Sequence, residues 1–494
     1  MTVAATAPGR VSKPWRALRN RSGRLPRTLT LLATVVLLAS CGEPEESVSE
    51  GSGPAGDDRP NIVVVCVDTL RADHCSLYGY SRPTTPNLER LAAEGFVARC
   101  FFANAPWTKP SVASYYTGLL PSAHGSRVGM FAAERKEERT VEVLSDRHTT
   151  LAEALAAAGY RTAAYTTNFN MAPKFGYAQG FEDYGFVAER GQRMVDLDAE
   201  GMQFGLEMLQ EREQDGAPRF LWLHLMSVHQ YASPDSGRPF RSETSTAIPR
   251  EARQAHRVER YPDLEAALDA YDHSILYVDR LIGKFFDAVR ERSDTVLVVL
   301  ADHGEEFLDH GGFEHGATLF REQLAVPFVA WGPGVPKGEM AGIADSLDLF
   351  PTLCALAGAD CPDPAGQGMF EPDGGVGAGK EQSFAEQHQR TRYRRYSLLW
   401  DDRKLIREID KKTGEADLRV LLDARAGGRP VAPRYVDEER LAPFLAALEE
   451  QRAKAERTLD EKVGEVETLL VTDEDLERLR ALGYARREGE AGEG

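Results

Sequence analysis

The chain has 494 residues, of which 42% are hydrophobic and 28% are charged, an ordinary composition for a soluble globular protein. This composition excludes a protein with many membrane spans, a collagen-like rod and a wholly disordered chain. The formal net charge of −18 argues against a nucleic-acid partner, because so acidic a protein repels phosphates. At roughly 100–200 residues per domain, the length corresponds to about two to four domains, or to one large domain with appendages.

The N-terminal segment is typical of a targeting signal. Seven basic and no acidic residues precede an apolar run at 28–40, which is too short to span a membrane comfortably but suits a signal-peptide core. The run ends in LASC (38–41), which resembles the lipobox of bacterial lipoproteins, where the cysteine becomes the acylated N-terminus. We therefore expect residues 1–41 to be a lipoprotein signal peptide with Cys41 as the lipidation site. The alternative is an ordinary secretory signal in which Cys41 is incidental.

Residues 42–58 are rich in Glu, Ser, Gly and Pro, which predicts a flexible linker between the anchor and the folded part. Several acyl chains would hold the protein stably at a membrane, unlike a single chain. The expected location is the cell envelope, with the protein lipid-anchored and facing the periplasm or the exterior.

Apolar runs alternate with helical patterns over the first two thirds of the chain. Strands are expected at 61–67, 161–166, 220–226, 295–301 and 326–330, and helices at 150–158, 264–289 and 348–357. Short apolar runs separated by helices are typical of a mostly parallel sheet covered on both faces. The predicted fold class is therefore α/β, with a doubly wound sheet in a large domain at 59–370.

The C-terminal third has a different pattern. A glycine-rich stretch at 366–379 marks a boundary, and 396–409 has the alternation of a β-hairpin. We predict a small antiparallel subdomain at 380–425 and a helical tail at 430–494. Within that tail, 441–470 and 473–482 have the charged, amphipathic pattern of helices.

Five cysteines follow the anchor. An extracytoplasmic compartment permits disulfides, and the expected pairs are Cys354 with Cys361 and, as a second possibility, Cys75 with Cys100. Cys66 lies inside an apolar strand and is expected to be a small buried hydrophobe.

The reactive side chains gather where predicted strands end. Asp68 follows the first strand, and Asp302 and His303 follow the fourth. Ligands of open α/β sheets bind beyond the carboxyl ends of the strands. Thr108, in the segment WTKPS (107–111), begins a short helix whose free N–H groups attract anions. One such Asp often only caps a helix, but two carboxylates, an imidazole and a hydroxyl together indicate a metal ion and a nucleophile.

Several motifs occur in a fixed order between residues 60 and 357, with weaker echoes to 484. They read PNIVVVCVDTLRADHCSLYGY, TTPNLERLAAEGF, APWTKPSVASYYTGLLPSAHG, LADHGEEFLDHG, FEHGATLFREQLAVPFVAWGPG and, at the end, LERLRALGY. In these motifs the chain resembles the sulfatase family of the alkaline phosphatase superfamily. The resemblance implies a large α/β domain with a smaller C-terminal subdomain. It also implies a divalent metal held by Asp68, Thr108, Asp302 and His303.

The motifs also depart from those of typical sulfatases. Thr69 replaces the second aspartate of a metal-binding doublet, and Val112 replaces an arginine. Around Tyr165–Asn170, where typical members carry a lysine and a histidine, this chain has Asn168 and neither of those two residues. Thr108 stands at the nucleophile position and cannot become formylglycine, so water or another acceptor must attack its esterified form. Threonine serves as nucleophile in related phosphotransferases and phosphodiesterases.

Three further residues are candidates for substrate contacts. By resemblance, His315 lies where typical sulfatases place a substrate-binding lysine, and His229 matches a family histidine after the third strand. Either could bind the anion or protonate the leaving group. Lys109 could pair with the substrate anion, or it could be an exposed lysine at a helix start. His224, inside the strand, is expected to be a hydrogen-bonded core histidine.

The predicted function is metal-dependent hydrolysis of sulfate or phosphate esters through Thr108, which attacks the sulfuryl or phosphoryl centre in line. Three oxygens and one imidazole nitrogen favour zinc or manganese over calcium as the single ion, although calcium stays possible. One alternative is a phosphoryl transferase or phosphodiesterase of the same superfamily. Another is a binding protein that kept the fold and lost the chemistry. The expected partners are the ester substrate and, through the lipid anchor, a membrane.

Overall fold

The computed structural model describes residues 57–475 and 477, without 130–139, 188–191, 235–238, 249–260, 363, 389–390, 401–402 and 424–437. The predicted signal peptide, Cys41 and nearly all of the linker lie outside these residues. None of the helices in the described ranges has the length and apolarity needed to cross a membrane.

A large sheet of eight strands lies at the centre of the described part of the chain. In spatial order the strands are β11 (Gly338–Asp345), β2 (Phe96–Phe102), β10 (Phe328–Trp331), β7 (Thr295–Ala301), β1 (Asn61–Val67), β6 (Arg219–Leu225), β4 (Arg161–Thr166) and β5 (Asp183–Phe186). Only β10 is antiparallel to its neighbours. The central strands β1, β6 and β7 are buried along their whole length, as expected for strands covered on both faces.

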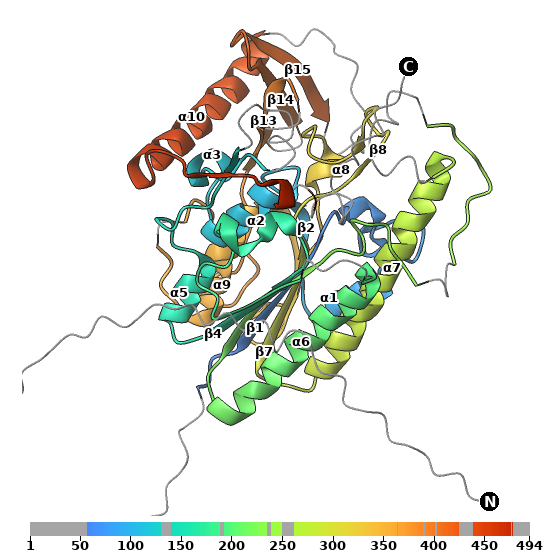
Figure 1. The fold of residues 1–494 in the computed structure, drawn as a ribbon, viewed down its shortest axis with the longest axis vertical. Coiled ribbons are helices and arrows are strands. Elements are labelled where there is room, and N and C mark those ends of the chain that lie inside the picture. Colours follow the sequence, from blue (N-terminus) through green and yellow to red (C-terminus); the bar gives the residue numbers. More distant parts are fainter. Residues whose placement is uncertain are drawn as a thin grey trace, which may run out of the picture.

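Helices cover both faces of this sheet (Figure 1). One face carries α1 (Pro86–Glu94), α6 (Met194–Asp215) and α7 (Leu264–Val289), with α7 in contact with both α1 and α6. The other carries α2 (Thr108–Thr117), α5 (Leu151–Ala157) and α9 (Leu349–Ala357). The predicted doubly wound α/β fold is confirmed.

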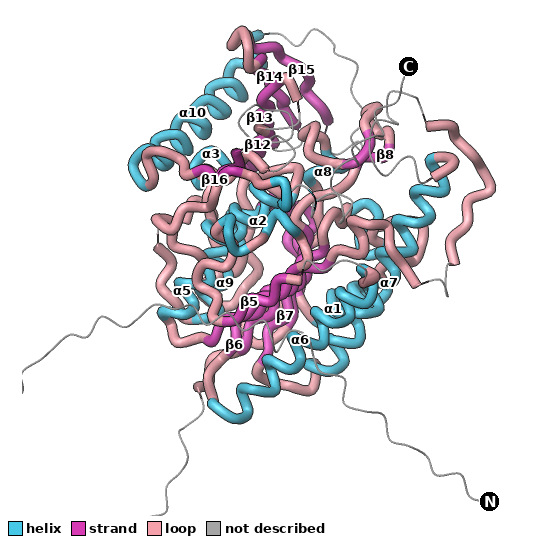
Figure 2. The backbone as a smooth tube through the Cα atoms, viewed as in Figure 1, coloured by secondary structure: helices cyan, strands magenta, loops and turns pink. Residues whose placement is uncertain are grey.

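The C-terminal part forms a second, smaller unit beside α10 (Figure 2). Its four antiparallel strands are β12 (Gln382–Gln387), β13 (Tyr393–Trp400), β14 (Arg403–Asp410) and β15 (Ala416–Asp423). Helix α10 (Glu438–Lys462) packs against it, with the Phe444 ring 5.2 Å from the Trp400 ring. The predicted antiparallel subdomain is therefore confirmed.

The predicted helix over 441–470 is too long. Gly464, at φ 73°, follows α10 in the left-handed conformation that ends helices. Beyond it, β16 (Thr468–Leu470) pairs antiparallel with β3 (Thr140–Glu142), and residues 473–475 are helical. Apart from short 3-10 turns, the other short elements of the described ranges are α3 (Pro121–His124), α8 (Arg321–Leu324), β8 (Glu306–Phe307) and β9 (Phe313–Glu314).

The cysteines of the described ranges are all free thiols, so neither predicted disulfide is formed. Cys354 and Cys361 share a hydrogen bond instead of a covalent bond. The Cys75 thiol donates to the Arg71 carbonyl at 3.2 Å, within its own turn. Cys66 is fully buried in β1, as predicted.

Candidate active site

The register of the central sheet brings two carboxylates together. Val67 of β1 pairs with Ala301 of the parallel strand β7, so the next residues, Asp68 and Asp302, leave the same edge of the sheet side by side. His303 follows directly, and the Asp68, Asp302 and His303 side chains are all fully buried. One ligand atom from each lies within 4.8 Å of the other two. The strand-end position predicted from the sequence is thus where these three side chains meet.

The three side chains present unpaired electron-rich atoms to one another. The His303 Nδ1 atom lies 2.8 Å from the Gly304 carbonyl oxygen, so Nδ1 carries the proton and Nε2 a lone pair. Nε2 lies 3.6 Å from Asp68 Oδ1 and 3.4 Å from Asp302 Oδ2. Both of these carboxylate oxygens are buried without a hydrogen-bond donor. Such orphaned acceptors are costly, and a divalent cation among them would satisfy all three.

Electrostatics fit the same interpretation. Burial, together with the neighbouring charge of His315, lowers the pKa of His303 to about 3, so its imidazole is neutral, as a metal ligand must be. Burial and the adjacent Asp68 carboxylate raise the pKa of Asp302 well above its usual range. A bound cation would remove this like-charge repulsion.

Thr108 begins helix α2 and faces the same cluster. Its Oγ1 lies 3.2 Å from Asp68 Oδ2 and 3.3 Å from His303 Nε2. Trp107 is extended before it, and Pro110 occupies the first turn, where no intrahelical N–H is needed. The Ser111 hydroxyl donates to the Asp302 carbonyl at 2.5 Å, which fixes the start of α2 to the end of β7. The sequence-based prediction that Thr108 joins the acidic pair agrees with these distances.

At the position of Thr69, typical sulfatases have an aspartate. Thr69 instead contacts the cluster through its backbone N–H. It is in the left-handed region at φ 63°, an uncommon conformation for a β-branched residue. Its N–H donates to Asp302 Oδ1 at 3.2 Å, and its hydroxyl donates to the Asp68 carbonyl at 2.7 Å. The Tyr271 hydroxyl donates to the Thr69 carbonyl at 2.6 Å. Strain held this firmly by neighbours is typical of functional sites.

Two buried side chains complete the cluster, and sequence reasoning missed both contacts. The Asn168 amide donates to Asp68 Oδ2 at 2.8 Å and to Thr108 Oγ1 at 3.2 Å. The His224 Nε2 atom lies 3.1 Å from Asp68 Oδ2. The interpretation of His224 as a hydrogen-bonded core histidine is confirmed, but its partner is the candidate metal ligand. The contact follows from the pairing of β6 with β1, which sets His224 opposite Cys66, and no signal in the sequence alone gives that pairing.

The two histidines expected to contact substrate lie next to this cluster. His315 follows β9, and its ring centroid lies 4.4 Å from that of His303 and 5.3 Å from that of His229. The His315 Nδ1 atom lies 3.0 Å from Glu305 Oε1. His229 follows β6, with Nδ1 3.2 Å from the Gln230 amide nitrogen. Both positions are compatible with an approach to a substrate at Thr108.

Lys109 is not brought into the cluster by any described contact. It is fully buried, with Nζ 4.6 Å from the centroid of the Phe175 ring and 5.2 Å from that of the Tyr177 ring. Burial lowers the pKa of Lys109 to about 7. The expectation of an exposed lysine at the helix start is therefore wrong, and the contacts of Lys109 are with aromatic rings of the core.

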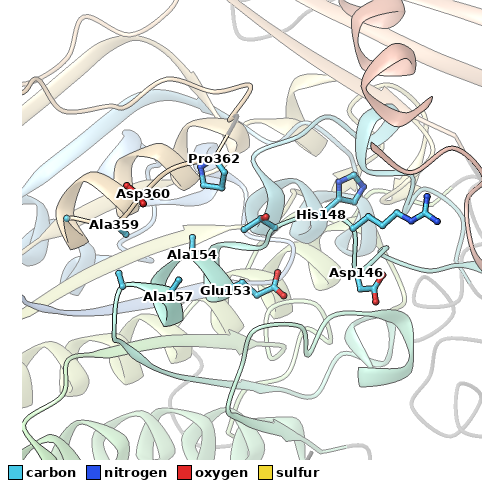
Figure 3. A pocket seen from close by; sticks show the side chains of 12 residues that line it. Asp146, His148, Glu153, Ala154, Ala157, Ala359, Asp360 and Pro362 are labelled. Atoms are coloured by element: carbon cyan, nitrogen blue, oxygen red, sulfur yellow. The ribbon is translucent and has the colours of Figure 1, made fainter. Parts of the chain in front are cut away.

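A separate cavity of about 520 Å³ lies between α5 and the segment after α9 (Figure 3). His148, Glu153 and Asp360 are among its lining residues. None of the residues that line it belongs to the Asp68–Thr108–Asp302–His303 cluster, so this hollow is not the candidate active site.

Comparisons with known proteins point to one family. A model of the family described as Sulfatase matches residues 60–359. Arylsulfatase A of Bos taurus is 25% identical over 367 residues, covering 63% of this chain and 67% of the relative. Arylsulfatase A of Homo sapiens is 26% identical over 359 residues, covering 62% of this chain and 65% of the relative. The chain thus spans about two thirds of the length of these relatives.

Solved structures share the fold. A 2-O GAG sulfatase aligns with a TM-score of 0.65 at 18% identity, covering 83% of this chain and 95% of that one. The phosphonate monoester hydrolase of Agrobacterium radiobacter aligns with a TM-score of 0.63 at 18% identity, covering 80% and 96%. Because the family model covers more than half of the chain, and the arylsulfatase relatives support activity on sulfate esters, this chain belongs to the sulfatase family of hydrolases.

Proposed function

We propose that this chain hydrolyses sulfate or phosphate esters in a metal-dependent reaction with Thr108 as the nucleophile. One observation carries the proposal. The Thr108 hydroxyl, two carboxylates and the His303 lone pair meet at the edge of the sheet, and the two carboxylate oxygens nearest His303 Nε2 lack donors. A purely structural cluster would pair these oxygens.

The residues that would hold the ion are Asp68, Thr108, Asp302 and His303. Their mixed oxygen and nitrogen donors favour zinc or manganese, with calcium as the less suited ion. When bound, a divalent cation would supply positive charge that favours the ionised Thr108 hydroxyl and offsets the charge of the transferred group.

Each step of the reaction is then assigned to residues of this chain. Thr108 Oγ1 attacks the sulfur or phosphorus atom, forming an Oγ1–S or Oγ1–P bond while the bond to the ester oxygen breaks. The proton that Thr108 loses must reach the leaving alcohol, and we assign this transfer to His315 or His229, because the His315 ring packs against those of His303 and His229. Water then attacks the sulfur or phosphorus atom of the esterified Thr108 and the bond to Oγ1 breaks. Sulfate or phosphate leaves, and a proton from the water restores the Thr108 hydroxyl.

A phosphorus-centred substrate is the second candidate. Thr108 cannot be converted to formylglycine, so its ester has no elimination route and must be cleaved by attack at sulfur or phosphorus. The structural likeness to a phosphonate monoester hydrolase is why a phosphorus-centred ester is included as a candidate. If an alcohol replaces water in the second step, the same site acts as a phosphoryl transferase.

Metal content and a substrate panel test the proposal. The purified protein should contain close to one equivalent of zinc, manganese or calcium. It should release 4-nitrophenol from an aryl sulfate, an aryl phosphodiester or an aryl phosphate, with Thr108→Ala as the control. Formation of a new ester from an added alcohol would identify a transferase. A protein with neither bound metal nor turnover would support the non-catalytic alternative.

We also propose that the enzyme acts outside the cytoplasm, anchored by lipid on Cys41. Support comes from the sequence alone: a basic segment, an apolar run and LASC at 38–41. The natural substrate would then be an extracytoplasmic ester within reach of the 42–58 linker.

A further inference from the structure

The two oxygens of the Asp68 carboxylate have opposite surroundings. Asp68 Oδ2 accepts three hydrogen bonds, from Thr108 Oγ1 at 3.2 Å, Asn168 Nδ2 at 2.8 Å and His224 Nε2 at 3.1 Å. Asp68 Oδ1 has no donor and lies 3.6 Å from His303 Nε2. A carboxylate oxygen with three donors has little capacity left for a cation, so Oδ1 is the atom that remains available.

The orientations of Asn168 and His224 are fixed by their own neighbours. Asn168 Oδ1 accepts the Asn170 N–H at 2.9 Å, which turns the Asn168 NH₂ group toward Asp68. His224 lies on β6 in register with Cys66 of β1, fully buried. Because a carboxylate only accepts, His224 Nε2 must carry the hydrogen that faces it.

We propose that Asn168 and His224 are positioning residues that hold Asp68 so that a cation binds through Oδ1 alone. This inference rests on the proposed function, since it assigns these side chains to the cation site described above. Asn168 has a second task, because the same NH₂ group contacts Thr108 Oγ1 at 3.2 Å and orients the nucleophile. Among the contacts of the described residues, His224 makes none with Thr108, so its role is confined to Asp68.

Substitutions at His224 and Asn168 distinguish the role toward Asp68 from the role toward Thr108. Loss of an outer hydrogen bond to a metal ligand typically weakens metal binding about 10–100-fold. His224→Leu should therefore raise the dissociation constant for the cation by about 10–100-fold, and excess cation should restore kcat to within a few-fold of wild type. Asn168→Ala should also weaken cation binding, but its kcat should stay at least about 10-fold low at saturating cation, because Thr108 loses its donor.

Binding of Zn²⁺ and Mn²⁺ to the metal-stripped full chain is measured by equilibrium dialysis without substrate, and turnover is then titrated with the same ions. Asn170→Ala changes the same turn without removing a donor to Asp68 and serves as the matched control. His224→Gln keeps an N–H donor and should retain near-wild-type affinity. His224→Phe preserves the ring volume and replaces His224→Leu if that variant does not fold.

The outcomes distinguish a failure of the proposed function from a failure of the positioning roles. If the wild-type chain binds neither ion, the proposed metal-dependent function fails. If the wild type binds an ion and both His224→Leu and Asn168→Ala bind it unchanged, the positioning roles are wrong while the function stands. If excess cation restores kcat in both variants alike, the second role of Asn168 is wrong.

Discussion

Replacement of Thr108 by alanine separates chemistry from stability. The change removes Oγ1 and its contacts with Asp68, His303 and Asn168, each at 3.2–3.3 Å. The Cβ atom remains, and alanine suits the first turn of α2. Asp68 Oδ2 keeps its bonds from Asn168 and His224, so no new buried acceptor is orphaned.

The two expected magnitudes differ widely. Loss of one net hydrogen bond costs about 0.5–1.5 kcal/mol of unfolding free energy, which for a domain this large shifts Tm by about 2–4 °C or less. Loss of the attacking atom should lower kcat by at least about 10³-fold, because only direct attack by water and the electrostatics of the site remain. Thr108→Ser keeps a hydroxyl and should retain measurable turnover.

The assay combines initial rates on aryl esters with thermal unfolding and with mass analysis of acid-quenched protein. During turnover by the wild type, the peptide that contains Thr108 should carry a sulfuryl or phosphoryl group, and the same peptide of Thr108→Ala should not. Full turnover by Thr108→Ala with an unchanged Tm would refute the nucleophile assignment. A collapse of both Tm and activity would instead mean that Thr108 is structural.

Three further outcomes follow from the same geometry. Asp302→Asn removes a charge that repels Asp68, so the metal-free variant should unfold at a temperature equal to or above that of metal-free wild type, and added cation should no longer raise its Tm. Lys109→Met should leave KM within about threefold of the wild-type value. Below pH 7 it should raise the free energy of unfolding by at most about 5 kcal/mol, because burial lowers the pKa of Lys109 from 10.5 to about 7. Because the folded-state pKa of Lys109 is the lower one, the wild type gains stability as pH rises from 7 to 10.5, and its deficit relative to Lys109→Met should shrink over that range in urea titrations. Cys41→Ala should abolish incorporation of labelled fatty acid in a bacterial host, whereas labelling that persists would exclude Cys41 as the anchor.

Elements with a clear periodicity were predicted closely, and those with conflicting signals were not. The bounds of β1, β4, β7 and α7 coincide with the predicted ranges. Helix α6 was missed, in part because it contains glycines. A Cβ on Gly201 would lie 2.7 Å from the Tyr165 ring, and one on Gly205 would lie 2.7 Å from Leu223. Close packing on the sheet requires these glycines, although they lower helix propensity.

The sequence predicted the residues of the candidate site that directly follow a strand. Asp68, Asp302 and His303 followed from the rule that parallel strands present their carboxyl ends at one edge. The contact of His224 with Asp68 depends on which strand lies beside β1, and a single sequence does not give that register. Lys109 is next to Thr108 in sequence, but successive helical side chains diverge by about 100°, which turns Lys109 toward Phe175.

The departures from the typical sulfatase pattern fit one another in terms of charge. Compared with the typical sulfatase motifs, Thr69 takes the place of an aspartate, Val112 takes the place of an arginine, and the segment around Asn168 lacks a lysine and a histidine. A site that lacked only the basic side chains would repel an anionic ester. A site that lacked only the aspartate would carry excess positive charge. On the proposed function, a cation held by this site would face two carboxylates instead of three, so more of its charge would be available to the substrate. The hydrogen bonds that Asn168 donates to Asp68 and Thr108 supply orientation without adding charge, so on the proposed function the cation would be the main positive charge that meets the ester.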